Sequence, residues 1–159
     1  MDIRSIALLA SALLLVATSL RADTKPEFLA TYDLEGDAIQ FEFENQAEAG
    51  CIWRPYPTRD AMLERLEEAG LQTRPSSLWV LEVVTWGAAV DDYHCAVLLE
   101  MELRRFSVPV EMPDGNTLRT DIPVWEASEM LTGPKIHMDD RVREKALTYL
   151  EQLLEGMPK

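Results

Sequence analysis

Few side chains in this sequence are of the types that perform nucleophilic or metal chemistry. Cys51, His94, Cys95 and His137 are all of its cysteines and histidines. His94 and Cys95 are neighbours in an alternating stretch, and neighbours on a strand point to opposite faces. Zinc sites use closely spaced pairs of ligands, whereas His137 lies about forty residues further on. We therefore predict no metal site, no cofactor and no catalytic thiol.

Carboxylates are abundant, so their pairing alone carries little information. The chain has 28 acidic residues. Asp91 and Asp92 fall in an expected hairpin, Asp139 and Asp140 at an expected helix start, and neither pair has the spacing of a calcium loop. No motif of a serine hydrolase and no glycine-rich phosphate loop occurs. A small secreted acidic hydrolase remains the alternative, and it requires carboxyl groups that converge on a groove.

One loop carries side chains that favour binding. Trp53, Arg54 and Tyr56 alternate with prolines, and Trp, Tyr and Arg are the types enriched at interaction hot spots. The prolines would hold these side chains stiffly. The alternative interpretation is that Trp53 and Tyr56 close one end of the core beside Cys51.

The N-terminus is typical of an exported protein. Residues 6–20 form an apolar run after a weakly positive start, and Ala22 offers a small residue at the exit. These features predict a signal peptide at 1–22. An uncleaved anchor is the alternative, but a spanning helix needs about 20 apolar residues. An extended lead-in at 23–37 and a single domain at 38–159 follow, and we expect a periplasmic or secreted protein.

Export determines how the charge and the cysteines are interpreted. The chain has a formal net charge of −13, and loss of residues 1–22 leaves −14. This acidity favours solubility and disfavours nucleic acid and anionic membranes as partners. In an oxidising compartment Cys51 and Cys95 are expected to form a disulfide, with two buried free thiols as the alternative.

The mature chain begins with a strand and a helix. Residues 38–44 alternate, with Ile39, Phe41 and Phe43 on one face. A loop over 45–57 precedes a helix that Thr58 is expected to cap and Gly70 to end. Its apolar stripe comprises Met62, Leu63, Leu66 and Ala69.

Three further strands and a helix complete the pattern. The strands are expected at 78–86, 93–106 and 118–130, with Pro123 indicating an edge position or a bulge in the last strand. Asp139 or Asp140 is expected to cap the final helix, which Gly156 ends. The order β-α-β-β-β-α predicts an α+β fold, in which two amphipathic helices cover one face of a mainly antiparallel sheet.

The sheet face away from the helices is expected to be mixed in character. With Cys95, Val97 and Leu99 pointing inward, Ala96 and Leu98 point outward. Such a face exceeds the apolar content usual for a solvated sheet. A homodimer, a protein partner or the lead-in segment would each explain it.

Several segments resemble uncharacterised exported bacterial proteins whose domain is similar to the N-terminal domain of TolB. They are the turn with Cys51, AMLERLEEAGL, the strand segments ELRR and PVWEASEML, and VREKALTYLEQLL. The resemblance runs from Ile39 to the C-terminus and implies a non-enzymatic envelope or interaction module. It supplies no catalytic residue. We therefore expect an exported binding or interaction module of unknown specific function.

Overall fold

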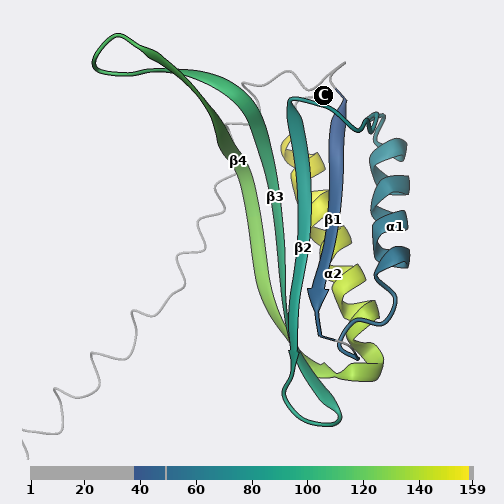
Figure 1. Cartoon of the computed structure of the whole chain (residues 1–159). Helices are drawn as coiled ribbons and strands as arrows, with labels where there is room; N and C mark the ends of the chain where they lie inside the picture. The colour runs from purple at the N-terminus through teal and green to yellow at the C-terminus, as the bar shows by residue number, and fades with distance from the viewer. Residues whose placement is uncertain (1–37, 49, 158–159) are drawn as a thin grey trace, which may run out of the picture.

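A four-stranded sheet covered on one face by two helices forms the body of the protein. The computed structural model describes residues 38–48 and 50–157, so the signal peptide and lead-in predicted for 1–37 lie outside the described residues. The elements follow the expected order (Figure 1): β1 (Ile39–Ala47), α1 (Pro55–Glu68), β2 (Trp79–Ala89), β3 (His94–Glu111), β4 (Thr117–Pro134) and α2 (Lys135–Gly156). The α+β fold class is confirmed.

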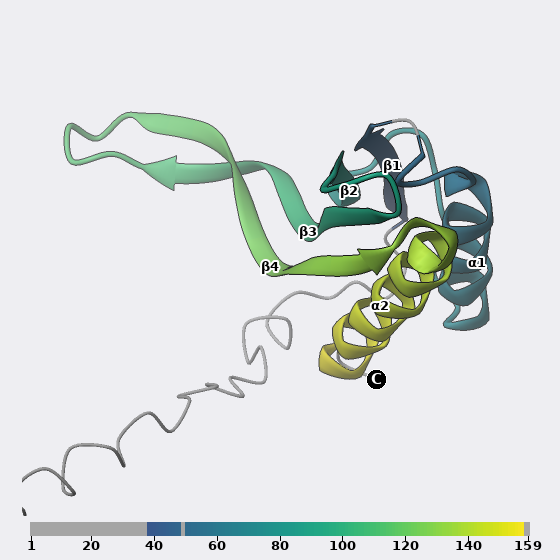
Figure 2. The same cartoon turned by 90° about the horizontal axis from the view of Figure 1, so that it is seen from below.

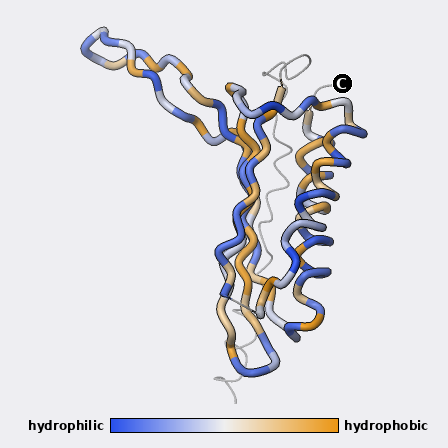
Figure 3. The backbone as a smooth tube through the Cα atoms, turned by 45° about the vertical axis from the view of Figure 1, so that its right-hand side comes forward, coloured by the Kyte–Doolittle hydropathy of each residue, from blue (hydrophilic) through white to orange (hydrophobic). Residues whose placement is uncertain are grey.

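The strands lie in the sheet in chain order. β1 pairs with β2 in parallel, and the crossover between them contains α1. β2 with β3 and β3 with β4 are antiparallel. Both helices lie on the same side of the sheet (Figure 3), and they pack against each other as well as against the strands.

The core lies between the helices and one face of the sheet. Trp79, Leu81 and Val83 of β2 are fully buried there. The inward set predicted for β3, from Cys95 to Leu103, is at most 1% exposed. Thr85 is also buried, and its hydroxyl donates to Asn45 Oδ1 at 2.8 Å, so this buried polar group has a partner.

The predicted helix ends are correct, whereas the predicted helix starts are wrong. Gly70 adopts a φ of +82° after α1, where Leu71 N–H donates to the Leu66 carbonyl. This is the Schellman arrangement, which favours glycine. α1 begins at Pro55 instead of after Thr58, since proline at the first helical position has no N–H to satisfy.

The second helix also begins earlier than predicted. α2 starts at Lys135, immediately after Pro134, so neither Asp139 nor Asp140 is its N-cap. Asp139 instead accepts hydrogen bonds from the backbone N–H groups of Trp53 and Arg54, at 3.1 and 3.3 Å. The Asp139 carboxylate, which the local pattern assigned to a helix cap, therefore makes a tertiary contact instead.

β3 and β4 continue beyond the sheet as a two-stranded arm. β2 ends its pairing with β3 at Arg105, and the arm bends away from the body there (Figure 2). The register shifts between Arg105 and Val108, where Ser107 has a positive φ of 61°. Ser107 N–H donates to Asp121, and Arg119 donates to the Ser107 carbonyl. These bonds hold the bend.

Pro123 meets both predictions made for it. β4 is an edge strand, and the register between β3 and β4 shifts beside Arg104, which pairs with Pro123. A proline at an edge removes no ladder hydrogen bond.

The expected disulfide joins Cys51 to Cys95, 44 residues apart, and both residues are fully buried. Replacing both cysteines with alanine should lower the free energy of unfolding by about 3–4 kcal/mol, because the unfolded chain regains the entropy of an open loop. Urea denaturation monitored by circular dichroism measures the change. A denaturation midpoint equal to that of the wild type would contradict a stabilising role.

Candidate binding site at the disulfide end

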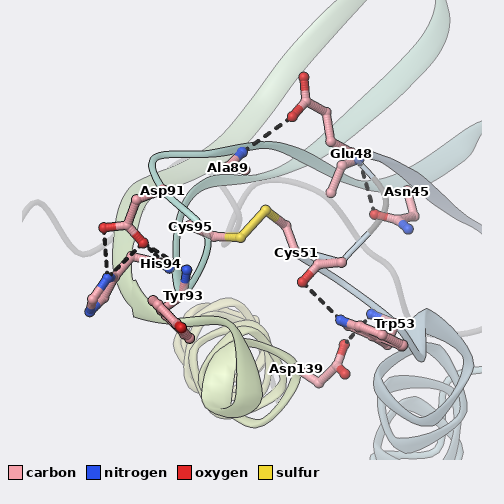
Figure 4. Close-up of a disulfide and its surroundings, with 12 residues drawn as sticks. Asn45, Glu48, Cys51, Trp53, Ala89, Asp91, Tyr93, His94, Cys95 and Asp139 are labelled. Atoms are coloured by element: carbon pink, nitrogen blue, oxygen red, sulfur yellow. Dashed lines mark hydrogen bonds and ion pairs between the residues drawn. A yellow bond between two sulfur atoms is a disulfide. The ribbon is translucent and has the colours of Figure 1, made fainter.

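The candidate site is built on the end of the sheet where the disulfide lies. Cys51 follows β1 and Cys95 is the second residue of β3, while β2 runs between these two strands. The disulfide therefore crosses the end of β2 and fastens the loop before α1 to the sheet. Figure 4 shows the loops around it.

Hydrogen bonds join the start of α2 to the same place. The Tyr93 carbonyl accepts from Lys135 N–H at 2.8 Å, just ahead of Cys95. Asp139, one turn further along α2, holds the backbone of Trp53 and Arg54. Its carboxylate also lies where α1 begins, and negative charge is favourable at a helix N-terminus. The loop before α1, the β2–β3 turn and the first turns of α1 and α2 are thus cross-linked to one another. We call this part of the molecule the platform.

The β2–β3 turn is held by one aspartate. Asp91 Oδ1 accepts from the backbone N–H groups of Tyr93 and His94 at 2.7 and 2.8 Å, and Oδ2 lies 2.9 Å from His94 Nδ1. The Tyr93 backbone bond and then the His94 side chain hold the pKa of Asp91 below its usual value. His94 is exposed and Cys95 is buried, so the two residues diverge as expected.

Large apolar side chains on this platform point into solvent. Trp53 is 72% and Tyr56 71% exposed. Tyr93 and Ile136 are 76% and 83% exposed, and Val90 in the β2–β3 turn is 66% exposed. Half of the large exposed apolar side chains of the described residues therefore gather at this end. Trp53 and Tyr56 do not close the core, which was the alternative to binding.

The predicted binding residues are placed on two different elements. Trp53 lies in the loop, where its indole N–H donates to the Gly50 carbonyl at 2.8 Å. Arg54 is the residue that precedes α1, and Tyr56 lies in the first turn of that helix. The loop predicted to end at Pro57 is thus shorter, and binding by these residues stays a prediction.

Tyr93 and Ile136 were not predicted as site residues. Tyr93 accepts the backbone hydrogen bond from Lys135, and Ile136 follows Lys135 in the sequence. This bond brings both side chains to the platform. The sequence offered no signal for Ile136, because the final helix was predicted to begin at Asp139 or Asp140, beyond this residue.

A second surface of interest is the sheet face away from the helices. Glu42, Glu82, Glu102 and Glu126 are register partners, so each strand contributes one glutamate to a single row. Arg104 donates to Glu82 at 2.6 Å, and its Nε lies 3.6 Å from Glu102. Glu82, Glu100, Glu102 and Glu126 line an open depression. This face is more acidic than the mixed face that the sequence predicted.

The pKa of Glu102, in the middle of this row, is raised above its usual value. Burial raises the pKa of Glu102, the charge of Arg104 opposes this, and the neighbouring carboxylates of Glu82, Glu126 and Glu100 raise it further. The apolar members of the face lie toward the disulfide end, where Trp86 donates to Glu100 at 3.0 Å.

Within 38–48 and 50–157, no group of three or more histidine, cysteine or acidic side chains is arranged to hold a metal ion. Among the same residues, no helix combines the length and apolar character needed to cross a membrane. Comparison with models of known protein families and with curated proteins finds no match to this chain.

The raised pKa of Glu102 predicts how the sheet responds to acid. A carboxyl group whose pKa is raised on folding stabilises the protein below its unfolded value, near 4.5, and this stability is lost as the pH rises through the folded value. Glu102→Gln should therefore increase stability at pH 7 by less than about 1 kcal/mol, because solvent screens the row. The increase should vanish below pH 4.5.

Thermal unfolding of wild type and variant across this pH range provides the measurement. Glu64→Gln, on the exposed side of α1, is the matched control for the removal of one negative charge. A Glu102→Gln variant that is less stable than wild type at pH 7 would contradict a pKa of Glu102 raised by burial and by its acidic neighbours.

Proposed function

We propose that this protein is an exported, non-enzymatic binding module that contacts a protein partner through the platform at the disulfide end. The observation that carries the proposal is the exposure of Trp53, Tyr56, Tyr93 and Ile136 on a cross-linked base. Exposed clusters of large apolar side chains mark interaction sites.

The rigidity of the platform supports this function. Aromatic side chains bind with little loss of conformational entropy when their backbone is already held. Here the disulfide holds the loop, and Asp139 holds the backbone of Trp53 and Arg54. Arg54 adds a cation at the rim of the cluster, where a charged group contributes orientation more than affinity.

The proposed compartment is the periplasm or the extracellular medium. The disulfide supports it, because structural disulfides persist in oxidising compartments. The apolar run at residues 6–20 supplies the export signal. N-terminal sequencing of the exported chain should start at Asp23, and a chain that retains Met1 would contradict cleavage.

The acidic sheet face can serve a further partner. Among the described residues, six glutamates of this face, on all four strands, are accompanied there by Arg104 alone. A second copy of the chain would bring like charges together on this face, so a partner that binds it is proposed to be cationic.

One observation favours a second candidate function. The depression lined by Glu82, Glu100, Glu102 and Glu126 contains convergent carboxylates, and Glu102 has a raised pKa. A carboxyl group that keeps its proton can act as a general acid while an ionised neighbour acts as base. Arg104 pairs with two of these glutamates, which leaves this candidate weaker than binding. Hydrolysis of glycoside substrates that is abolished in Glu102→Gln would establish it.

Photo-crosslinking tests the binding proposal. A photoreactive phenylalanine analogue at position 56 of the exported chain should capture a discrete protein partner, because Tyr56 projects from the platform. The same analogue at Gln152, an exposed position nearer the far end of α2, is the control and should capture none.

Affinity for the captured partner then measures the role of the aromatic side chains. Trp53→Ala should weaken binding by at least about thirtyfold, the loss typical of a hot-spot residue. Leu78→Ala removes an exposed apolar side chain just before β2, at the opposite end of the strands, and should leave this affinity unchanged. Equal effects of the two substitutions would contradict binding at the disulfide end.

A further inference from the structure

The arm formed by β3 and β4 beyond Arg105 has one apolar side. Val108 pairs with Thr120 and Val110 with Leu118, and cross-strand partners point to the same side of a ribbon. Leu118 is 54% exposed, and Met112 near the tip is 42% exposed. Ile122, two residues from Thr120 on the same strand, continues this side. We call these residues, Val108, Val110, Leu118, Thr120 and Ile122, the apolar side of the arm.

Beyond Phe106 and Ser107 at the bend, the opposite side of the arm is largely polar. It carries Pro109, Glu111, Thr117, Arg119 and Asp121, which alternate with the apolar residues. Arg119 and Asp121 are used on this side to hold the backbone of Ser107 at the bend. The sequence therefore maintains alternation over a stretch that no helix and no further strand of the part that the structure describes covers. A two-stranded ribbon is marginal in water by itself, so its apolar side is expected to pack against something.

The edges of the arm are poorly suited to strand pairing. β3 is free of β2 beyond Arg105, and its free stretch contains Pro109. β4 is an edge strand and contains Pro123 where the arm leaves the sheet. Proline lacks the N–H that a new strand would need, and natural edges are protected in this way. The contact that remains available to the arm is face-to-face packing of its apolar side.

Charge distinguishes the arm from the body. The chain carries a net charge of −13, and the sheet face away from the helices presents a row of four glutamates. From Arg105 to Ile122, two arginines accompany three acidic residues, so the arm is nearly neutral. Two copies of this chain would repel each other body to body, whereas their arms can meet with little repulsion.

The arm is also placed to make such a contact. It leaves the body at the end of the strands opposite to the disulfide and bends outward (Figures 1 and 2). Contact between two arms therefore keeps the two acidic bodies apart. A contact of one surface with its own copy is symmetric, which is the arrangement most homodimers use.

We propose that the chain forms a homodimer by face-to-face packing of the apolar sides of two arms. The occupant of each apolar side is the arm of a second copy. The dimer requires neither the acidic sheet face nor the platform at the disulfide end, so this proposal is independent of the proposed function.

Light scattering coupled to size-exclusion chromatography of the exported chain tests the proposal. At tens of micromolar concentration and physiological salt, the wild type should have the mass of a dimer. Leu118→Lys should raise the dimer dissociation constant by at least about thirtyfold, because each arm then brings a cation into the apolar contact. The mass should become that of a monomer.

The matched control is Thr117→Lys. It adds the same charge at the neighbouring position, where the side chain lies on the polar side opposite Glu111 and gains an oppositely charged partner. This variant should remain dimeric. Unchanged circular dichroism and an intact disulfide in both variants show that the body is folded, since neither position lies in the core.

Three outcomes would overturn the proposal. The first is a wild type that is monomeric at these concentrations, and the second is a dimer that Leu118→Lys and Thr117→Lys affect equally. The third concerns the lead-in, which contains Phe28, Tyr32 and Leu34. The lead-in precedes β1, whose first residue pairs with Trp79, and Trp79 in turn pairs with Arg105 at the base of the arm. A monomer that dimerises when these three side chains are replaced by serine would show the lead-in to be the occupant.

Discussion

The covalent link between Cys51 and Cys95 is the constraint on which the arrangement of this protein depends. β1 and β3 are not neighbours in the sheet, and the disulfide joins their ends across β2. Since α1 begins four residues after Cys51, the link also determines where that helix starts. At its other end α1 is held to α2 by the ion pair of Arg65 with Glu151. This ion pair is half-exposed, so it constrains the helix less than the covalent link does. The exposed aromatic side chains thus depend on the disulfide for their position.

Alternation and periodicity predicted the elements because the signals for them are local. The predicted inward positions of β3 belong to the core, and so do Met62 and Leu66 of the stripe predicted for α1. The other two members of that stripe do not, because Leu63 is only half-buried and Ala69, at the end of the helix, is exposed. Helix starts were not predictable in the same way, because several residues competed for one role. Thr58 is a good cap by type, yet it is buried inside the first turns of α1. Asp139 makes its hydrogen bonds with a loop 86 residues earlier.

The alignment of the glutamates in the acidic row could not be predicted from a local sequence pattern. Each of its glutamates lies at an outward position of its strand, which the sequence indicates. Their alignment depends on the register of four strands, including the parallel pairing of β1 with β2. A shift of one residue in any strand would place that glutamate on the other face. The aromatic platform was partly predictable, since Trp53 and Tyr56 lie in one loop, but Tyr93 and Ile136 reach it only through the fold.

The acidic row has a physical consequence for how the molecule meets others. An open sheet face invites stacking on a second sheet, and a row of like charges across its centre opposes this. Contacts between copies of this chain are thereby disfavoured on this face and left to the two ends of the strands. β2 spans 11 residues between them, a length of about 35 Å. A partner at the disulfide end and a second copy at the arm can therefore be held at the same time without touching.

This separation determines what an arm-to-arm dimer would offer its partner. The two platforms would lie at the far ends of the pair, each on a rigid body, with the arms between them. A partner with repeated sites would then be bound twice, and the second contact would form at a high effective concentration if the bend at Ser107 sets the right span. Arg119 and Asp121 fix that bend through the backbone of Ser107. The geometry of the bend, as well as the aromatic side chains, would then determine the strength of binding.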